Sequence, residues 1–176
     1  MNLKVKQISE FWRDFSSNKI ALFSLFIFLF ILFVAIFAPL VSPTDPYDLT
    51  TVDIMDSRLP PGSSNFEGQV FWLGSDGAGR DMLSSIFYGL RVSLGVGALS
   101  GAIALTIGSF FGISAAFFRG KYETFVMRVV DIQLSFPSIL LALIIIAAFG
   151  KGVDKTIIAL ILVQWAYYAR TARASA

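Results

Sequence analysis

Long uncharged apolar runs alternate with charged segments along this chain. The first two runs cover residues 20–41 and 92–118, and each is long enough for the hydrocarbon core of a bilayer, which needs about 20 apolar residues. A third run covers residues 132–150. A fourth covers residues 156–169 and is short for a span. This pattern predicts an all-α membrane protein with four transmembrane helices.

The residues just before the second run form a two-sided pattern. In a helix, one side would carry Met82, Leu83, Ile86, Phe87 and Leu90, and the other side Asp81, Ser84, Ser85, Tyr88 and Arg91. Such a split is typical of a helix that lies on a membrane surface. We therefore predict an external interfacial helix over residues 81–90, with its polar face in water and a bend at Gly89 into the span. One continuous helix over residues 81–118 is the alternative.

Small residues gather on one face of the second run. This face includes two pairs with small-xxx-small spacing, Gly97 with Gly101 and Gly108 with Gly112. Lipid tails are as apolar as leucine, so helices associate in membranes by close packing, which glycine allows. We predict a tight helix–helix contact at these four glycines, with Leu105 facing lipid or a looser contact. The alternative is that small residues are simply frequent in such helices.

The polar segments divide the chain into four parts. Residues 1–19 are mildly basic, and we expect a cytoplasmic segment that forms either a short surface helix or a frayed tail. Residues 20–41 exceed the apolar region of a signal peptide, about 7–15 residues, and are interpreted as a retained first transmembrane helix. Residues 42–80 hold six of the twelve acidic side chains and are predicted to be an external loop, with residues 70–73 as a candidate extended piece. Residues 81–176 hold the remaining helices, with a short charged connection after the second run.

The basic residues indicate an orientation. If the amino terminus is cytoplasmic, nine basic residues fall on the cytoplasmic side and five on the other, as the positive-inside rule requires. The cytoplasmic set is Lys4, Lys6, Arg13, Lys19, Arg119, Lys121, Arg128, Arg170 and Arg173, and the external set is Arg58, Arg80, Arg91, Lys151 and Lys155.

The composition excludes several kinds of chemistry. Cysteine and histidine are absent, which removes disulfides, thiol nucleophiles and His- or Cys-based zinc sites. No nucleotide-binding glycine motif is present and the aspartates lack EF-hand spacing, so we expect no cofactor or metal site. A net charge of +2 does not indicate nucleic acid as a partner. An enzyme is disfavoured, because intramembrane chemistry would need an ionisable residue within a span.

Several motifs together resemble one known family. Residues 73–81 read LGSDGAGRD and residues 88–97 read YGLRVSLGVG. They are similar to the LGTD-x-x-GRD and YGxRxSL segments of C-type permease subunits of dipeptide, oligopeptide and nickel ABC importers. Residues 122–131 and 136–142 resemble the entrance to the third helix of that family. The resemblance extends over nearly the whole chain.

The resemblance implies a type I ABC importer permease in the inner membrane. It implies as partners a B-type permease, two cytoplasmic ATPase subunits, an external solute-binding protein and membrane lipid; peptide, nickel complex and glycopeptide stay open as the solute. Residues 168–176 resemble the approach to the family's EAA-type coupling loop, but the loop itself is absent. We therefore expect the amino-terminal part of a longer permease, which by itself cannot couple to an ATPase. The alternative is a small polytopic scaffold or channel-forming subunit without an ATPase partner.

Overall fold

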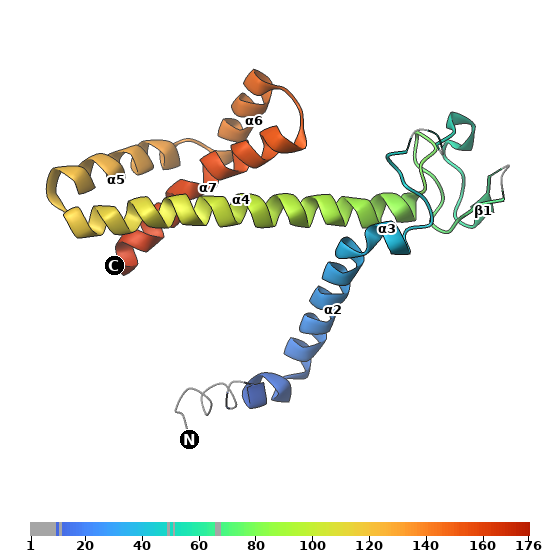
Figure 1. The fold of residues 1–176 in the computed structure, drawn as a ribbon, viewed down its shortest axis with the longest axis horizontal. Coiled ribbons are helices and arrows are strands. Elements are labelled where there is room, and N and C mark those ends of the chain that lie inside the picture. Colours follow the sequence, from blue (N-terminus) through green and yellow to red (C-terminus); the bar gives the residue numbers. More distant parts are fainter. Residues whose placement is uncertain (1–9, 11, 49, 51, 66–67) are drawn as a thin grey trace. The chain divides into compact units, whose positions relative to one another are not determined.

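The computed structural model describes residues 10, 12–48, 50, 52–65 and 68–176. The chain divides into two compact units, residues 1–92 and residues 93–176. Figure 1 shows the helices and strands in the order of the chain. Residues 12–17 are helical, and the rest of the surface helix predicted before residue 10 lies outside the described residues.

The first apolar run forms α2 (Lys19–Ile36) and the short α3 (Ala38–Val41). Asn18 caps α2, because its Oδ1 accepts hydrogen bonds from the backbone N–H groups of Ile20 and Ala21. The prediction of one helix over residues 20–41 is wrong at Phe37, whose φ of −94° and ψ of 14° interrupt the helix. Pro39 explains the break, since a proline ring clashes with the carbonyl four residues earlier.

Residues 42–80 fold into an irregular loop with three small elements. These are the 3₁₀-helix η1 (Ile54–Asp56) and the antiparallel strands β1 (Ser63–Ser64) and β2 (Val70–Phe71), with Ser63 opposite Phe71. The extended piece predicted at residues 70–73 is therefore confirmed for its first two residues. Hydrogen bonds between residues 57–59 and residues 75–77 hold the rest of the loop together.

The second apolar run lies in α4 (Met82–Phe118), which is one continuous helix of 37 residues. The prediction of a separate interfacial helix that bends at Gly89 is therefore wrong. A glycine inside a helix costs only about 1 kcal/mol relative to alanine, and sharp kinks need a proline or an inserted group. Residues 82–118 contain no proline, so the backbone ladder continues through Gly89.

Two residues of the predicted polar face, at its beginning, are packed and not in water, which corrects a second part of that prediction. Asp81 and Ser84 are buried, whereas Met82 and Ile86 on the apolar face are exposed. The backbone N–H and the hydroxyl of Thr44 both lie 3.1 Å from Ser84 Oγ, which in turn donates to Asp81 Oδ2. Thr44 of the preceding loop thus provides Ser84 with partners, whereas Asp81 Oδ1 and Ser85 Oγ are buried without a hydrogen bond among the described residues.

The second unit contains α5 (Gly120–Ser135), α6 (Ser138–Phe149) and α7 (Val153–Ser175). The charged connection predicted after residue 118 is thus the first part of a helix. Residues 132–150 do not form one straight helix, because α5 and α6 meet at an angle of 88°. Phe136 is extended, with φ −88° and ψ 139°, since a residue before proline is pushed out of helical geometry, and Pro137 follows it.

Two helices among the described residues, α2 and α4, are long and apolar enough to cross a membrane, and a third span results if the bent pair α5–α6 counts as one. The core of the second unit lies where α5 meets α7. Val130, Ala166 and Ala169 are fully buried there, and Met127, Leu134 and Trp165 pack against them.

Candidate functional site

Two of the four predicted packing glycines lie directly against α7. A Cβ placed on Gly108 would lie 2.6 Å from the Cβ of Tyr168 and would also meet the Trp165 carbonyl. A Cβ on Gly112 would lie 2.9 Å from the Cβ of Ala172 and would meet the Ala169 carbonyl. Such distances leave no room for any side chain, so the backbones of α4 and α7 approach at these two positions because both residues are glycine.

The buried residues of α4 in the second unit form a single stripe. They follow one another at intervals of three or four residues, which keeps them on one helix face: Ser100, Ala104, Gly108, Gly112 and Ala115. Gly97 and Gly101 are different, since a Cβ on either would meet nothing within 4 Å among the described residues. Leu105 is 50% exposed.

A side-chain amide joins α5 to α7 close to the bend. Gln133 Nε2 donates to the carbonyl of Leu162, and Gln133 Oε1 accepts a hydrogen bond of 2.8 Å from Trp165 Nε1. The ring of Trp165 also makes an edge contact with Phe111 of α4, with centroids 5.8 Å apart. Sequence reasoning missed this pair; the signal was a lone amide at the start of an apolar run and a tryptophan in the next helix.

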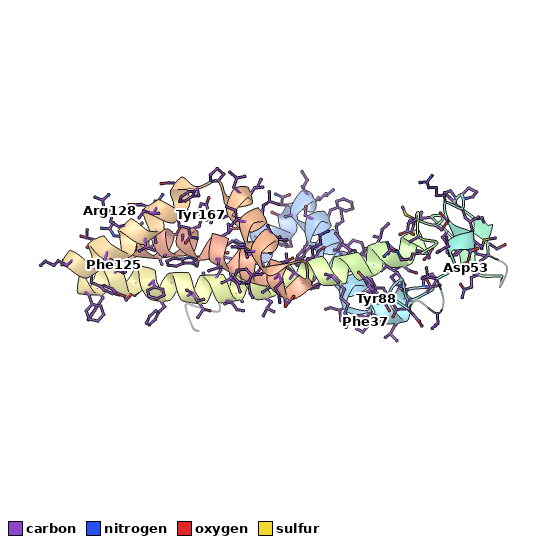
Figure 2. All side chains as sticks on the ribbon, turned by 90° about the horizontal axis from the view of Figure 1, so that it is seen from above. Phe37, Asp53, Tyr88, Phe125, Arg128 and Tyr167 are labelled. Atoms are coloured by element: carbon purple, nitrogen blue, oxygen red, sulfur yellow. The ribbon has the colours of Figure 1, made fainter. Side chains whose placement is uncertain are left out.

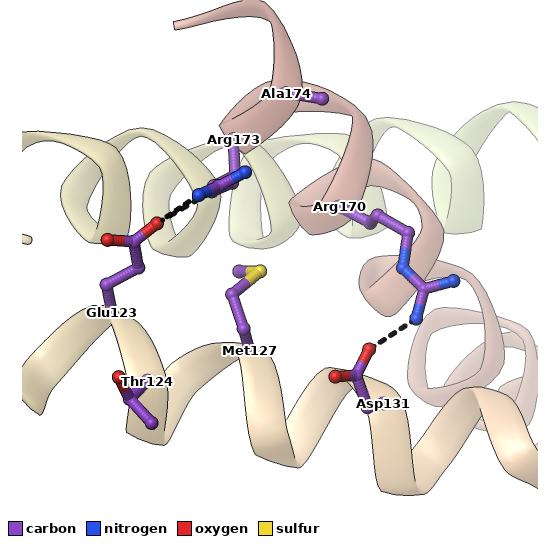
Figure 3. A pocket seen from close by; sticks show the side chains of 7 residues that line it. All are labelled: Glu123, Thr124, Met127, Asp131, Arg170, Arg173 and Ala174. Atoms are coloured by element: carbon purple, nitrogen blue, oxygen red, sulfur yellow. Dashed lines mark hydrogen bonds and ion pairs between the residues drawn. The ribbon is translucent and has the colours of Figure 1, made fainter.

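Two ion pairs also connect α5 and α7, farther from the bend than Gln133. Arg170 Nη2 lies 2.5 Å from Asp131 Oδ1, and Arg173 Nε lies 2.8 Å from Glu123 Oε1. Figure 3 shows both pairs bridging α5 and α7, with Met127 between them, around an open pocket of about 410 Å³. These charges are partly exposed, so each pair contributes only about 0–1 kcal/mol to the free energy of folding. Their main effect is to fix the register of α5 against α7.

The carboxylate of Asp76, in the loop, accepts hydrogen bonds from residues that follow it in the chain. Burial acts to raise the pKa of Asp76, but the backbone N–H groups of Arg80 and Ala78 and the guanidinium of Arg80 donate to it and outweigh this effect. The pKa of Asp76 therefore lies below its ordinary value. Across the described residues, no three acidic side chains gather in a way that could hold a metal ion.

Comparison with known proteins gives matches at both ends of the chain. Residues 6–61 match the N-terminal transmembrane domain of oligopeptide transport permease C, and residues 108–176 match the binding-protein-dependent transport system inner membrane component. The di/tripeptide transport system permease protein DppC of Pseudomonas aeruginosa is 41% identical over 169 residues, which are 96% of this chain and 54% of that protein.

Two further relatives agree. The dipeptide transport system permease protein DppC of Escherichia coli K12 is 38% identical over 169 residues, 96% of this chain and 55% of that protein. The oligopeptide transport system permease protein OppC of Bacillus subtilis is 31% identical over 172 residues, 96% of this chain and 53% of that protein. The chain belongs to the C-type permease family of peptide transport systems. The resemblance found in its motifs is thereby confirmed.

The C-type permease family is a transport family of the inner membrane and not a family of enzymes. The chain spans about half the length of the curated C-type permeases it matches. The matched segment at residues 108–176 contains Gly108, Gly112, Gln133 and Trp165, so the whole α5–α7 contact falls within the permease match.

Proposed function

We propose that this chain is part of a permease subunit of an ATP-driven importer for peptides or a similar solute. The observation that carries the proposal is the pair of family matches at residues 6–61 and 108–176, together with similarity to di/tripeptide, dipeptide and oligopeptide permeases over 96% of the chain. By this analogy, the partners are a B-type permease, two cytoplasmic ATPase subunits and an external solute-binding protein.

The proposed arrangement in the membrane has four spans. The first span consists of α2 and α3, the second is α4, the third is the bent pair α5–α6, and the fourth is α7. The 23 residues of α7 extend about 34 Å at 1.5 Å each. Residues 1–19 lie in the cytoplasm, residues 42–80 form the external loop, and residues 81–176 begin the permease domain. The positive-inside distribution supports this orientation.

The glycine face of α4 is proposed to serve two contacts. The half with Gly108 and Gly112 receives α7, and the open half with Gly97 and Gly101 receives a helix of the partner permease. The space around Gly97 and Gly101 supports the second contact, because small residues leave a groove that lipid tails fill less well than a helix backbone does.

A gene replacement tests this function. In cells without other peptide importers, removal of the gene that carries this chain is expected to abolish uptake of a radiolabelled dipeptide, and the intact gene on a plasmid restores it. Unchanged uptake after the removal would contradict the proposal and would favour the scaffold or channel-forming alternative.

A further inference from the structure

The charged side chains of α5 are sorted between two sides of the helix. Its acidic residues Glu123 and Asp131 are each paired with an arginine of α7. Its basic residues Lys121 and Arg128 are exposed and have no ion pair among the described residues. The side of α5 that faces away from α7 therefore carries net positive charge, although the helix itself has as many acidic as basic residues.

Three of the outward side chains line one hollow. Lys121, Phe125 and Arg128 are spaced by four and three residues, which places them on one helix face. They surround an open hollow of about 600 Å³, whose lining also includes Gly120, Glu123 and Thr124. Figure 2 marks Phe125 and Arg128 along α5. Because Glu123 is already paired with Arg173, the free charges at this hollow are cationic.

The turn from α4 into α5 adds further aromatic and basic residues. Phe117 and Phe118 end α4 and are 79% and 68% exposed, and Phe125 is 68% exposed. Arg119 follows them as the first charged residue after the uncharged run of residues 92–118, and it is exposed and without an ion pair among the described residues. We call the set Phe117, Phe118, Arg119, Lys121, Phe125 and Arg128 the basic–aromatic corner.

We propose that the basic–aromatic corner binds the headgroups of anionic phospholipids. Unpaired lysine and arginine side chains attract phosphate, and each one near an anionic leaflet strengthens the attraction. Phenylalanine rings beside lysine and arginine are typical of segments at the boundary between headgroups and acyl chains, where the rings insert and the charges stay at the headgroups. The inference rests on the proposed function only in that α4 must be embedded in a bilayer.

The test uses a fluorescent label beside the hollow. The chain has no cysteine, so Thr124→Cys gives a single site for a bimane label. The labelled protein is placed in nanodiscs that contain equal amounts of phosphatidylglycerol and phosphatidylcholine, with bromine on the acyl chains of one or the other. Bromine quenches bimane at short range, so the ratio of the two quenching values reports which lipid is enriched at the corner.

We expect brominated phosphatidylglycerol to quench more strongly, and we expect this preference to disappear near 1 M salt, where the Debye length is about 3 Å. Lys121→Gln with Arg128→Gln should lower the preference roughly fivefold for each charge removed. The matched control, Lys151→Gln with Lys155→Gln, also removes two positive charges but should leave the preference unchanged. Equal quenching by both lipids in the unaltered protein would overturn the inference.

A second label separates this inference from the proposed function. Leu105→Cys carries the same fluorophore on the exposed side of α4 and should be quenched equally by both lipids. Quenching at position 105 but by neither lipid at position 124 would overturn lipid binding at the corner and leave the proposed function intact. Absence of quenching at position 105 would contradict the membrane embedding itself, and with it both proposals.

Discussion

The indole Nε1–H of Trp165 donates a hydrogen bond of 2.8 Å to Gln133 Oε1 and so joins α7 to the last turn of α5. The chain bends by 88° just beyond this turn, at Phe136 and Pro137. A proline break leaves the two half-helices free to change their angle, because no backbone hydrogen bond to Pro137 fixes it. The Gln133–Trp165 bond therefore fixes where α5 lies against α7 at the point where the backbone itself gives least support.

Replacement of Gln133 by leucine should destabilise the second unit. Both hydrogen bonds of its amide are lost, and interhelical hydrogen bonds of this kind contribute about 1–2 kcal/mol in model membrane helices. Unfolding by SDS from a mild detergent, followed by circular dichroism, measures the loss. Gln164→Leu is the matched control, since the structure gives Gln164 no hydrogen-bond partner among the described residues. An equal loss in both variants would show that the bond has no special role.

The two halves of the glycine face should respond differently to a large side chain. Gly108→Leu places atoms where the Tyr168 Cβ and the Trp165 carbonyl already lie, and overpacking of this kind costs about 1–3 kcal/mol. Gly101→Leu meets open space, so the free energy of unfolding should stay within about 0.5 kcal/mol of the unaltered value. The same SDS titration measures both.

Gly101→Leu should instead weaken co-purification with the B-type permease, because the leucine would fill the groove left for the partner helix. Leu105→Ala is the control for both measurements and should change neither much, since Leu105 is half exposed. A Gly101→Leu variant that retains its partner as well as Leu105→Ala does would contradict a docking role for the open half of the face.

The orientation in the membrane can be checked with reporter fusions. A reporter that is active only outside the cytoplasm should be active when fused after Gly62, in an exposed turn of the loop, and inactive when fused after Lys121. The reason is the excess of basic residues assigned to the cytoplasmic side. The reverse pattern would contradict the charge argument and the four-span arrangement together.

The loop should keep its turn at residues 76–80 in mild acid and lose it only at lower pH. The pKa of Asp76 is lowered from 3.8 by the hydrogen bonds of Ala78 and Arg80. A lowered pKa in the folded state contributes stability that is fully present above 3.8 and is lost as the pH falls through the folded value. The Arg80 Nε–H resonance, followed by NMR during an acid titration, reports the opening.

Asp76→Asn provides the control for this titration, because an amide cannot release or bind the proton in question. The variant should show no transition of the Arg80 resonance in that range. A midpoint at or above 3.8 in the unaltered protein would contradict a carboxylate stabilised by Arg80.

Composition and periodicity were enough to predict the class of fold, and they failed where helices begin and end. The uncharged runs at residues 20–41 and 92–118 contain all of α2 except Lys19 and most of α4. In lipid there is no water for the backbone N–H and C=O groups, so they must pair with one another within a helix. Periodicity cannot place the breaks at Phe37 and Phe136, where a proline nearby outweighs a continuous apolar run. It also suggested a water-facing polar surface at Ser84, which Thr44 covers from a segment 40 residues earlier.

The candidate site was predictable only in its local part. The spacing of Gly108 and Gly112 pointed to a helix contact, since a groove of small residues depends only on the sequence of one helix. That α7 is the helix in contact with these glycines could not be predicted, because the register of α7 against α4 depends on contacts between distant segments. The same holds for Gln133 and Trp165, which are 32 residues apart and meet only because α7 runs back along α5.

Transport in a reconstituted system tests the central claim most directly. The full protein that carries this chain is placed in liposomes with a B-type permease and the ATPase subunits, and the solute-binding protein and a radiolabelled dipeptide are added outside. We predict that the dipeptide accumulates only with hydrolysable ATP enclosed, and that Gly108→Leu lowers the rate while Leu105→Ala does not. Dipeptide that crosses equally well without ATP would identify a channel-forming subunit and contradict the importer.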